Sequence, residues 1–125
     1  MNYTRTGMVF CTSNYEACVR FYTEVMALPV MFSLDNEYSK LTCVAMAGNY
    51  LMIETGGTSV PEGKTLAQNP IWLRFNVDDV ETAVKELAAK GVSVDYQKAP
   101  WGATASFLDP DGNRCQLREE STFLP

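Results

Sequence analysis

An internal repeat is the feature that most constrains what this chain can fold into. The segment Asn14–Arg20, NYEACVR, aligns with Asp79–Lys85, DVETAVK, at a separation of about 65 residues. The dipeptide Gly48-Asn49 falls on Gly112-Asn113 at nearly the same separation. A chain that repeats itself in this way is expected to build two similar units, each a small sheet backed by one helix.

Hydrophobic periodicity predicts the same order of elements in both repeats: a strand, a helix and three further strands. In the first repeat, about residues 4–55, we predict a strand over 4–12, a capped helix over 15–26, and antiparallel strands over 30–34, 41–47 and 50–53. In the second repeat, about residues 70–120, we predict a strand over 71–77, a helix from 80 that stops at Gly91, and strands over 92–96, 103–108 and 114–117. Ser13 or Asn14 supplies the first helix cap and Asp78 or Asp79 the second.

Residues 56–69 contain three glycines and little apolar periodicity, so they are interpreted as a linker. The 125 residues therefore predict one α+β domain made of two tandem βαβββ repeats. We expect their curved mixed sheets to enclose a cleft. The turn Asp109–Asn113 is expected to be structural, because proline, glycine and aspartate each favour a tight turn.

The composition excludes several kinds of chemistry. The chain has no histidine, which rules out Ser-His-Asp and Cys-His catalysis and every metal site that uses imidazole. A net charge of -5 argues against a nucleic-acid partner, since such binding depends on clustered lysine and arginine. No stretch approaches the ~20 apolar residues that span a bilayer, so no membrane partner is expected.

The four cysteines, Cys11, Cys18, Cys43 and Cys115, form no Cys-x-x-Cys pair. They are interpreted as buried free thiols, as in a reduced, cytoplasmic protein.

Four segments carry a family resemblance. They are FYTEVMALPV at 21–30, FNVDDV at 75–80, Trp101-Gly102, and DPDGN at 109–113. In their order along the chain they resemble the vicinal-oxygen-chelate superfamily, which includes glyoxalase I, extradiol dioxygenases and bleomycin-resistance proteins. The resemblance covers nearly the entire chain and implies the same fold.

Metal-using members of that superfamily place their ligands on the first and last strand of each repeat. The resemblance maps these places here onto Gly7, Met52, Trp72 and Gln116. Of these only Gln116 offers an oxygen to a hard cation, so we expect no metal and no other cofactor. A register shift of two residues would bring Glu54 to the place of Met52.

Without a metal, the same positions become the walls of a binding site. Trp72 offers a flat face, Met52 an adaptable apolar surface, Gly7 extra room and Gln116 an orienting amide. Strand alternation adds Val9 beside Gly7 and Arg74 beside Trp72, where Arg74 is either an anion-binding group or half of a structural ion pair. Trp101 is either a second aromatic wall or part of the core. Phe32 and Tyr38, with Tyr50, are expected to line the mouth.

The first hypothesis is a metal-free binding protein that sequesters a planar or cationic antibiotic-like molecule, with no catalytic residue assigned. The resemblance also implies a homodimer. The alternative is an enzyme. It is either a degenerate lactoylglutathione-lyase-like or dioxygenase-related protein with a divalent metal on Glu54 and Gln116, or a metal-free catalyst with Glu54 as base and Arg74 as anion clamp. A third possibility is a protein-interaction scaffold with a filled cleft.

Overall fold

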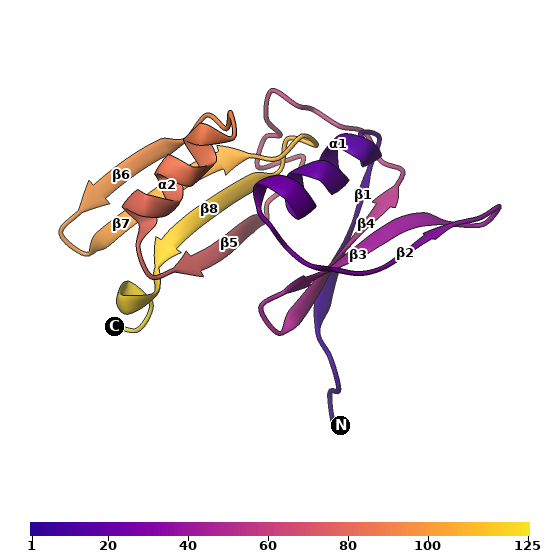
Figure 1. Cartoon of the computed structure of the whole chain (residues 1–125), viewed down its shortest axis with the longest axis horizontal. Helices are drawn as coiled ribbons and strands as arrows, with labels where there is room; N and C mark the ends of the chain where they lie inside the picture. The colour runs from indigo at the N-terminus through magenta and orange to yellow at the C-terminus, as the bar shows by residue number, and fades with distance from the viewer. The chain divides into compact units, whose positions relative to one another are not determined.

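The computed structural model describes all 125 residues and divides them into two units, Met1–Ser59 and Val60–Pro125. Each unit is a four-stranded mixed sheet with one α-helix, in the order βαβββ (Figure 1). The predicted α+β class and the two repeated halves are therefore confirmed. None of the helices is long and apolar enough to cross a bilayer.

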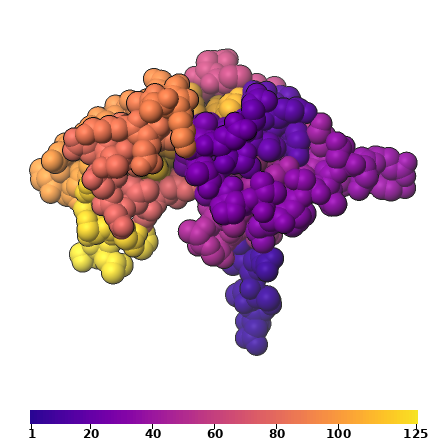
Figure 2. Space-filling view, viewed as in Figure 1, coloured from indigo at the N-terminus to yellow at the C-terminus, as the bar shows by residue number.

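Unit 1 contains β1 (Gly7–Thr12), α1 (Tyr15–Arg20), the π-helical turn η1 (Phe21–Val25), β2 (Val30–Asp35), β3 (Lys40–Met46) and β4 (Asn49–Thr55). The strand order is β1-β4-β3-β2, with β1 parallel to β4 and the other pairs antiparallel. Figure 2 shows the N-terminal residues and the β2–β3 hairpin projecting from this unit.

The core of unit 1 lies between α1 with its π-helical turn and one face of the sheet. Cys18 and Tyr22 of the helical segment are fully buried, as are Leu51 and Ile53 of β4. The Phe10 ring of β1 meets the Tyr22 ring edge to face, with centroids 6.0 Å apart. Because strand side chains alternate between faces, the residues between these core positions are left on the open face of the sheet.

Unit 2 contains β5 (Trp72–Val77), α2 (Val80–Ala89), β6 (Asp95–Ala99), β7 (Gly102–Leu108), β8 (Arg114–Glu119) and the 3₁₀ turn η2 (Glu120–Thr122). The order β5-β8-β7-β6 repeats the topology of unit 1, with β5 parallel to β8. The predicted cap is confirmed at Asp79, whose carboxylate accepts the backbone N–H of Thr82. Val80 and Leu87 are buried on the inner side of α2.

Three predicted boundaries are wrong for local reasons. The helix expected to reach residue 26 changes at Phe21 to π-helical bonding, in which Met26 N donates to Phe21 O. The strand expected over 92–96 begins at Asp95, because Val92 N still donates to Leu87 O and closes the end of α2. The first strand begins at Gly7 and not at residue 4.

Two sequence expectations about side chains also need correction. Asn14 occupies the first N-cap, yet its side chain makes no capping hydrogen bond there. Cys18, Cys43 and Cys115 are buried free thiols as predicted, whereas Cys11 is exposed, because it lies on the open face of β1.

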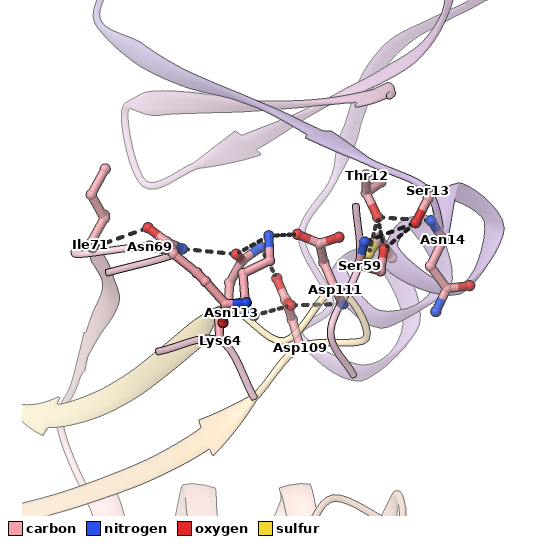
Figure 3. A network of polar contacts seen from close by, with 12 residues as sticks. Thr12, Ser13, Asn14, Ser59, Lys64, Asn69, Ile71, Asp109, Asp111 and Asn113 are labelled. Carbon is pink, nitrogen blue, oxygen red and sulfur yellow. Dashed lines mark hydrogen bonds and ion pairs between the residues drawn. The ribbon is translucent and has the colours of Figure 1, made fainter. Parts of the chain in front are cut away.

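The segment over 56–69 contains neither helix nor strand, but hydrogen bonds fix it. Gly56 N donates to Thr12 O at 3.0 Å within unit 1. From residue 60 onward the segment is bonded to the β7–β8 turn, where Lys64 N donates to Gly112 O at 3.0 Å. Figure 3 shows the side chains of Lys64 and Asn69 bonded to those of Asp111 and Asn113. The Lys64 ammonium lies 2.5 Å from the carboxylate of Asp111, whose side chain is 1% exposed.

Candidate functional site

The open face of the unit 2 sheet carries the residues that form the candidate site. Trp72, Arg74 and Gln116 line an open pocket of about 490 Å³. Trp72 and Arg74 are alternate residues of β5, and the parallel register sets Arg74 opposite Gln116 of β8. The predicted shared face of Trp72 and Arg74 is confirmed by the strand.

A chain of hydrogen bonds crosses the strands at the centre of this face. Arg74 Nε donates to Gln116 Oε1 at 2.8 Å, and Gln116 Nε2 donates to Ser106 Oγ of β7 at 3.4 Å. Both ends of the Gln116 amide are thereby engaged, which fixes which end is oxygen and which is nitrogen. Arg74 is accordingly oriented by Gln116 and is not half of an ion pair.

Trp72 is 43% exposed and is held by Arg114, its cross-strand neighbour on β8. The Arg114 guanidinium carbon lies 5.4 Å from the centroid of the Trp72 ring, within cation–π range. Arg114 is itself anchored, because Nη1 donates to Lys64 O at 2.8 Å and Nη2 donates to Asn69 O. The Arg114 Nε is buried without a hydrogen-bond partner. Alternation places Arg114 on this face, but its contact with Trp72 follows only from the register.

Trp101 does not face Trp72. It is 54% exposed, so it is not a core residue, and its ring contacts the Arg118 guanidinium at 5.1 Å. Arg118 lies four residues after Arg114 on β8, about 13 Å along the strand. Because Arg118 Nη2 donates to Thr122 O at 2.8 Å while Arg114 is bonded to 64 and 69, the two guanidiniums are held apart. A single planar ligand cannot stack between the two indoles.

Unit 1 presents an apolar row on its own open face. Cross-strand pairing brings Val9, Met52, Cys43 and Phe32 into one line across the four strands. Val9 and Phe32 are 51% and 43% exposed, whereas Cys43 is buried. Burial raises the pKa of the Cys43 thiol, which keeps it protonated and unsuited to act as nucleophile or metal ligand. Glu54 lies one row further along, opposite Cys11.

Two sequence-predicted positions of unit 1 do not behave as expected. Gly7 provides no extra room, because the ring of its cross-strand neighbour Tyr50 covers it and occupies the space that a side chain would take. Tyr38 is 88% exposed in the turn between β2 and β3, away from the row that contains Met52. Phe32, on strand β2, is the only one of these three aromatic residues that lies in the row.

The donor set at the family's ligand positions does not fit a divalent metal. Gly7 has no side chain, the Trp72 indole cannot ligate, and Met52 offers a soft thioether. The one hard donor, Gln116 Oε1, already accepts a hydrogen bond from the cationic Arg74 group, whose charge would repel a metal ion. Nor does any group of three or more His, Cys, Asp or Glu side chains come together in the 125 residues.

Comparison with known proteins assigns the chain to a family. Residues 5–117 match the family model of the Glyoxalase/Bleomycin resistance protein/Dioxygenase superfamily. The chain belongs to this superfamily. A relative from Bacillus subtilis (strain 168), the uncharacterized protein YraH, is 27% identical over 115 residues, which cover 84% of this chain and 89% of YraH.

Two solved structures of the superfamily fold show how varied its members are. Lactoylglutathione lyase from Agrobacterium tumefaciens superposes with a TM-score of 0.73 at 18% identity, covering 99% of this chain and 98% of the lyase. TnmS3, an antibiotic binding protein from Streptomyces sp. CB03234, superposes with a TM-score of 0.70 at 23% identity, covering 94% and 96%. One fold thus serves an enzyme and a binding protein, so the side chains of the site must decide between these functions.

Proposed function

We propose that this protein is a metal-free small-molecule binding protein that takes a planar, antibiotic-like ligand on the free face of Trp72. The observation that carries the proposal is an exposed indole held against Arg114 beside a pocket of about 490 Å³. An exposed indole offers a large flat surface for stacking, and an indole held in place loses little entropy on binding a ring. The antibiotic-binding function of TnmS3, on the same fold, supports this proposal.

Of the two ligand kinds that the sequence predicts, planar and cationic, the site favours the planar one. Arg74, Arg114 and Arg118 all lie on the open face of the unit 2 sheet. Their charges repel a cationic ligand at the site, even though the whole chain is acidic.

The lyase alternative needs Glu54 and Gln116 to hold a divalent metal, and the engagement of Gln116 by Arg74 argues against it. A homodimer and a cytoplasmic location stay predictions. Light scattering on the purified protein tests the first, and fractionation of the cells that express it tests the second.

Tryptophan fluorescence tests the proposed function. In the Trp101→Phe variant Trp72 is the only fluorescent indole, and Trp101 is a matched control because it is also exposed and also rests on an arginine. We expect planar aromatic compounds to quench Trp72 in this variant and in the wild type. The Trp72→Leu variant should lose about tenfold or more in affinity, since a stacked ring also contributes its buried area.

Two results would overturn the proposal. The first is the failure of every planar compound in a screen to perturb Trp72. The second is turnover of the methylglyoxal–glutathione adduct in the presence of added nickel, zinc or manganese, which would restore the enzyme hypothesis.

A further inference from the structure

We propose that the ligand of this site is anionic, with a pair of negatively charged oxygens that bind Arg74 while its planar ring stacks on Trp72. This inference rests on the proposed function and adds the chemical class of the ligand. It differs from the sequence-based expectation of a cationic molecule.

The hydrogen bonds of Arg74 leave most of its donors available. Its guanidinium donates from Nε to Gln116 Oε1, and this is a bond to a neutral amide. The ion pairs of unit 2 are Lys64 with Asp111 and Lys85 with Glu81, and neither includes Arg74. The two terminal nitrogens of this exposed guanidinium, which lines the pocket, are therefore not neutralised by a carboxylate.

The charges around Arg74 have the same sign. Arg114 gives its hydrogen bonds to the backbone carbonyls of 64 and 69, and Arg118 bonds to Thr122, so neither is neutralised by these contacts. Two acidic side chains also lie near this face, and both bond to amides: Gln97 donates to Asp95 at 3.4 Å, and Asn76 donates to Glu120 at 2.8 Å. Asp95 is in the same row as Arg74, but three strands away on β6. Three arginines against these two carboxylates give this face a positive charge within a chain of net charge -5.

The spacing of Trp72 and Arg74 fits an aromatic acid. Alternate residues of a strand are about 6.6 Å apart and point to the same side of the sheet. A ring stacked on Trp72 can therefore direct an acidic group on its edge toward Arg74. The planar fork of arginine binds two oxygens of a carboxylate or a phosphate at once, and Gln116 already orients this fork.

Three naphthalene compounds of nearly equal shape test the inference: 2-naphthoate, 2-naphthyl phosphate and the neutral 2-naphthamide. Calorimetric titration of the full chain at low salt should show one or both anions binding about tenfold more tightly than the amide. The tighter of the two anions identifies the source of the paired oxygens. The preference should shrink at high salt, because the site is open to solvent.

Substitutions at Arg74 then separate a binding role from a structural one. Arg74→Gln should remove the preference for the anions while binding of 2-naphthamide and the Tm stay unchanged, and Arg74→Lys should keep part of the preference. Arg118→Gln is the matched control, because it removes the same charge from the same face and should keep the preference.

The outcomes distinguish this inference from the proposed function. Equal binding of the anions and the amide, or a preference that survives in Arg74→Gln, would overturn the anionic ligand and leave the aromatic site standing. Failure of all three compounds to bind the wild type would overturn the anionic ligand, and the proposed function would fall with it only if every planar compound in the screen also left Trp72 unperturbed. Loss of all three in Trp72→Leu, together with loss of the preference alone in Arg74→Gln, would support both.

Discussion

The two sheets have one topology and opposite chemistry on their open faces. Equivalent central rows cross the four strands of each unit, apolar in unit 1 and polar in unit 2. The row of unit 1 is Val9, Met52, Cys43 and Phe32, and the row of unit 2 is Arg74, Gln116, Ser106 and Asp95. The helix-facing sides remain apolar in both units, since they build the cores. The shared topology therefore depends on the face of each sheet that the helix covers. The residues of the open face can differ between the units without changing the fold.

The cross-strand pair at the start of each unit shows the same divergence. Gly7 pairs with Tyr50 in unit 1, and Trp72 pairs with Arg114 at the equivalent place in unit 2. In both units the β4 or β8 side chain lies over its neighbour, but in unit 1 a ring fills the space over a glycine. Unit 1 thereby closes the position at which unit 2 offers an aromatic surface.

The largest expected effect concerns the turn between the last two strands, which has buried charges only in unit 2. Asp111→Ala leaves the Lys64 ammonium, 14% exposed, without its carboxylate. Breaking such a buried pair costs about 3–5 kcal/mol in the free energy of unfolding, measured by urea denaturation. Glu81→Ala removes an exposed partner 3.9 Å from Lys85 and should change little. Equal effects of the two substitutions would show that the buried pair does not hold the turn.

The next largest expected effect on the free energy of unfolding concerns two glycines in equivalent turns. Gly48 and Gly112 both have a φ of +88° in equivalent turns, but only at Gly112 would a Cβ meet a backbone atom, the carbonyl oxygen of Val60. Gly48→Ala should cost about 1–2 kcal/mol, the penalty of the left-handed conformation. Gly112→Ala should cost about 1–3 kcal/mol more, because the chain at Val60 must move. Equal unfolding free energies for the two variants would contradict the close approach of residue 60 to this turn.

A smaller effect on the free energy of unfolding is expected at Gly7, which the Tyr50 ring covers. Gly7→Ala should cost about 1 kcal/mol, since the Tyr50 ring must leave its place. In a Tyr50→Ala background the same change should instead stabilise by about 0.5–1 kcal/mol, because alanine suits a strand better than glycine. A double-mutant cycle measured by chemical denaturation gives the sign of each step. The same sign in both backgrounds would contradict the contact.

The smallest effect is at the helix caps, which also differ between the units. Hydrogen bonds from Thr82 hold the pKa of Asp79 below its ordinary value, so the native state favours the carboxylate. Its stabilisation is complete above the ordinary Asp pKa of about 3.9 and is lost as the pH falls through the lower native value. Asp79→Ala should therefore lower the Tm at neutral pH, and the difference from wild type should disappear in acid.

Asn14→Ala is the control for the cap, because the Asn14 side chain makes no capping hydrogen bond. The Tm difference between Asn14→Ala and wild type should not follow the pH dependence of Asp79→Ala, because an amide does not titrate. Parallel pH curves for wild type and Asp79→Ala would show that the ionised cap contributes nothing.

The sequence predicted what local periodicity and chain position determine. The repeat, the helical faces and the Asp79 cap follow from alternation and spacing, as does the shared face of Trp72 and Arg74. It could not predict contacts that depend on register between distant strands. Tyr50 over Gly7 and Arg114 over Trp72 are two such contacts, and each changes what its position can do.

The composition of a segment also could not predict its long-range contacts. Residues 56–69 read as a linker because they lack apolar periodicity, yet polar bonds and not apolar packing fix Lys64 and Asn69 to the β7–β8 turn. The alternative in which Trp101 forms a second aromatic wall opposite Trp72 failed for a related reason. Both are aromatic residues of one unit, but they rest on arginines at opposite ends of β8.

The bonds of residues 60–69 to the Asp109–Asn113 turn decide where this chain can be divided. A second half that began at residue 70 would lack Lys64 and Asn69, so Asp111 would lose its ion pair with Lys64 and Asn113 its hydrogen bonds to both side chains. The peptide bond between Ser59 and Val60 separates the hydrogen bonds to Ser13 from those to Asp111. It is the natural junction for joining two separately labelled halves by ligation.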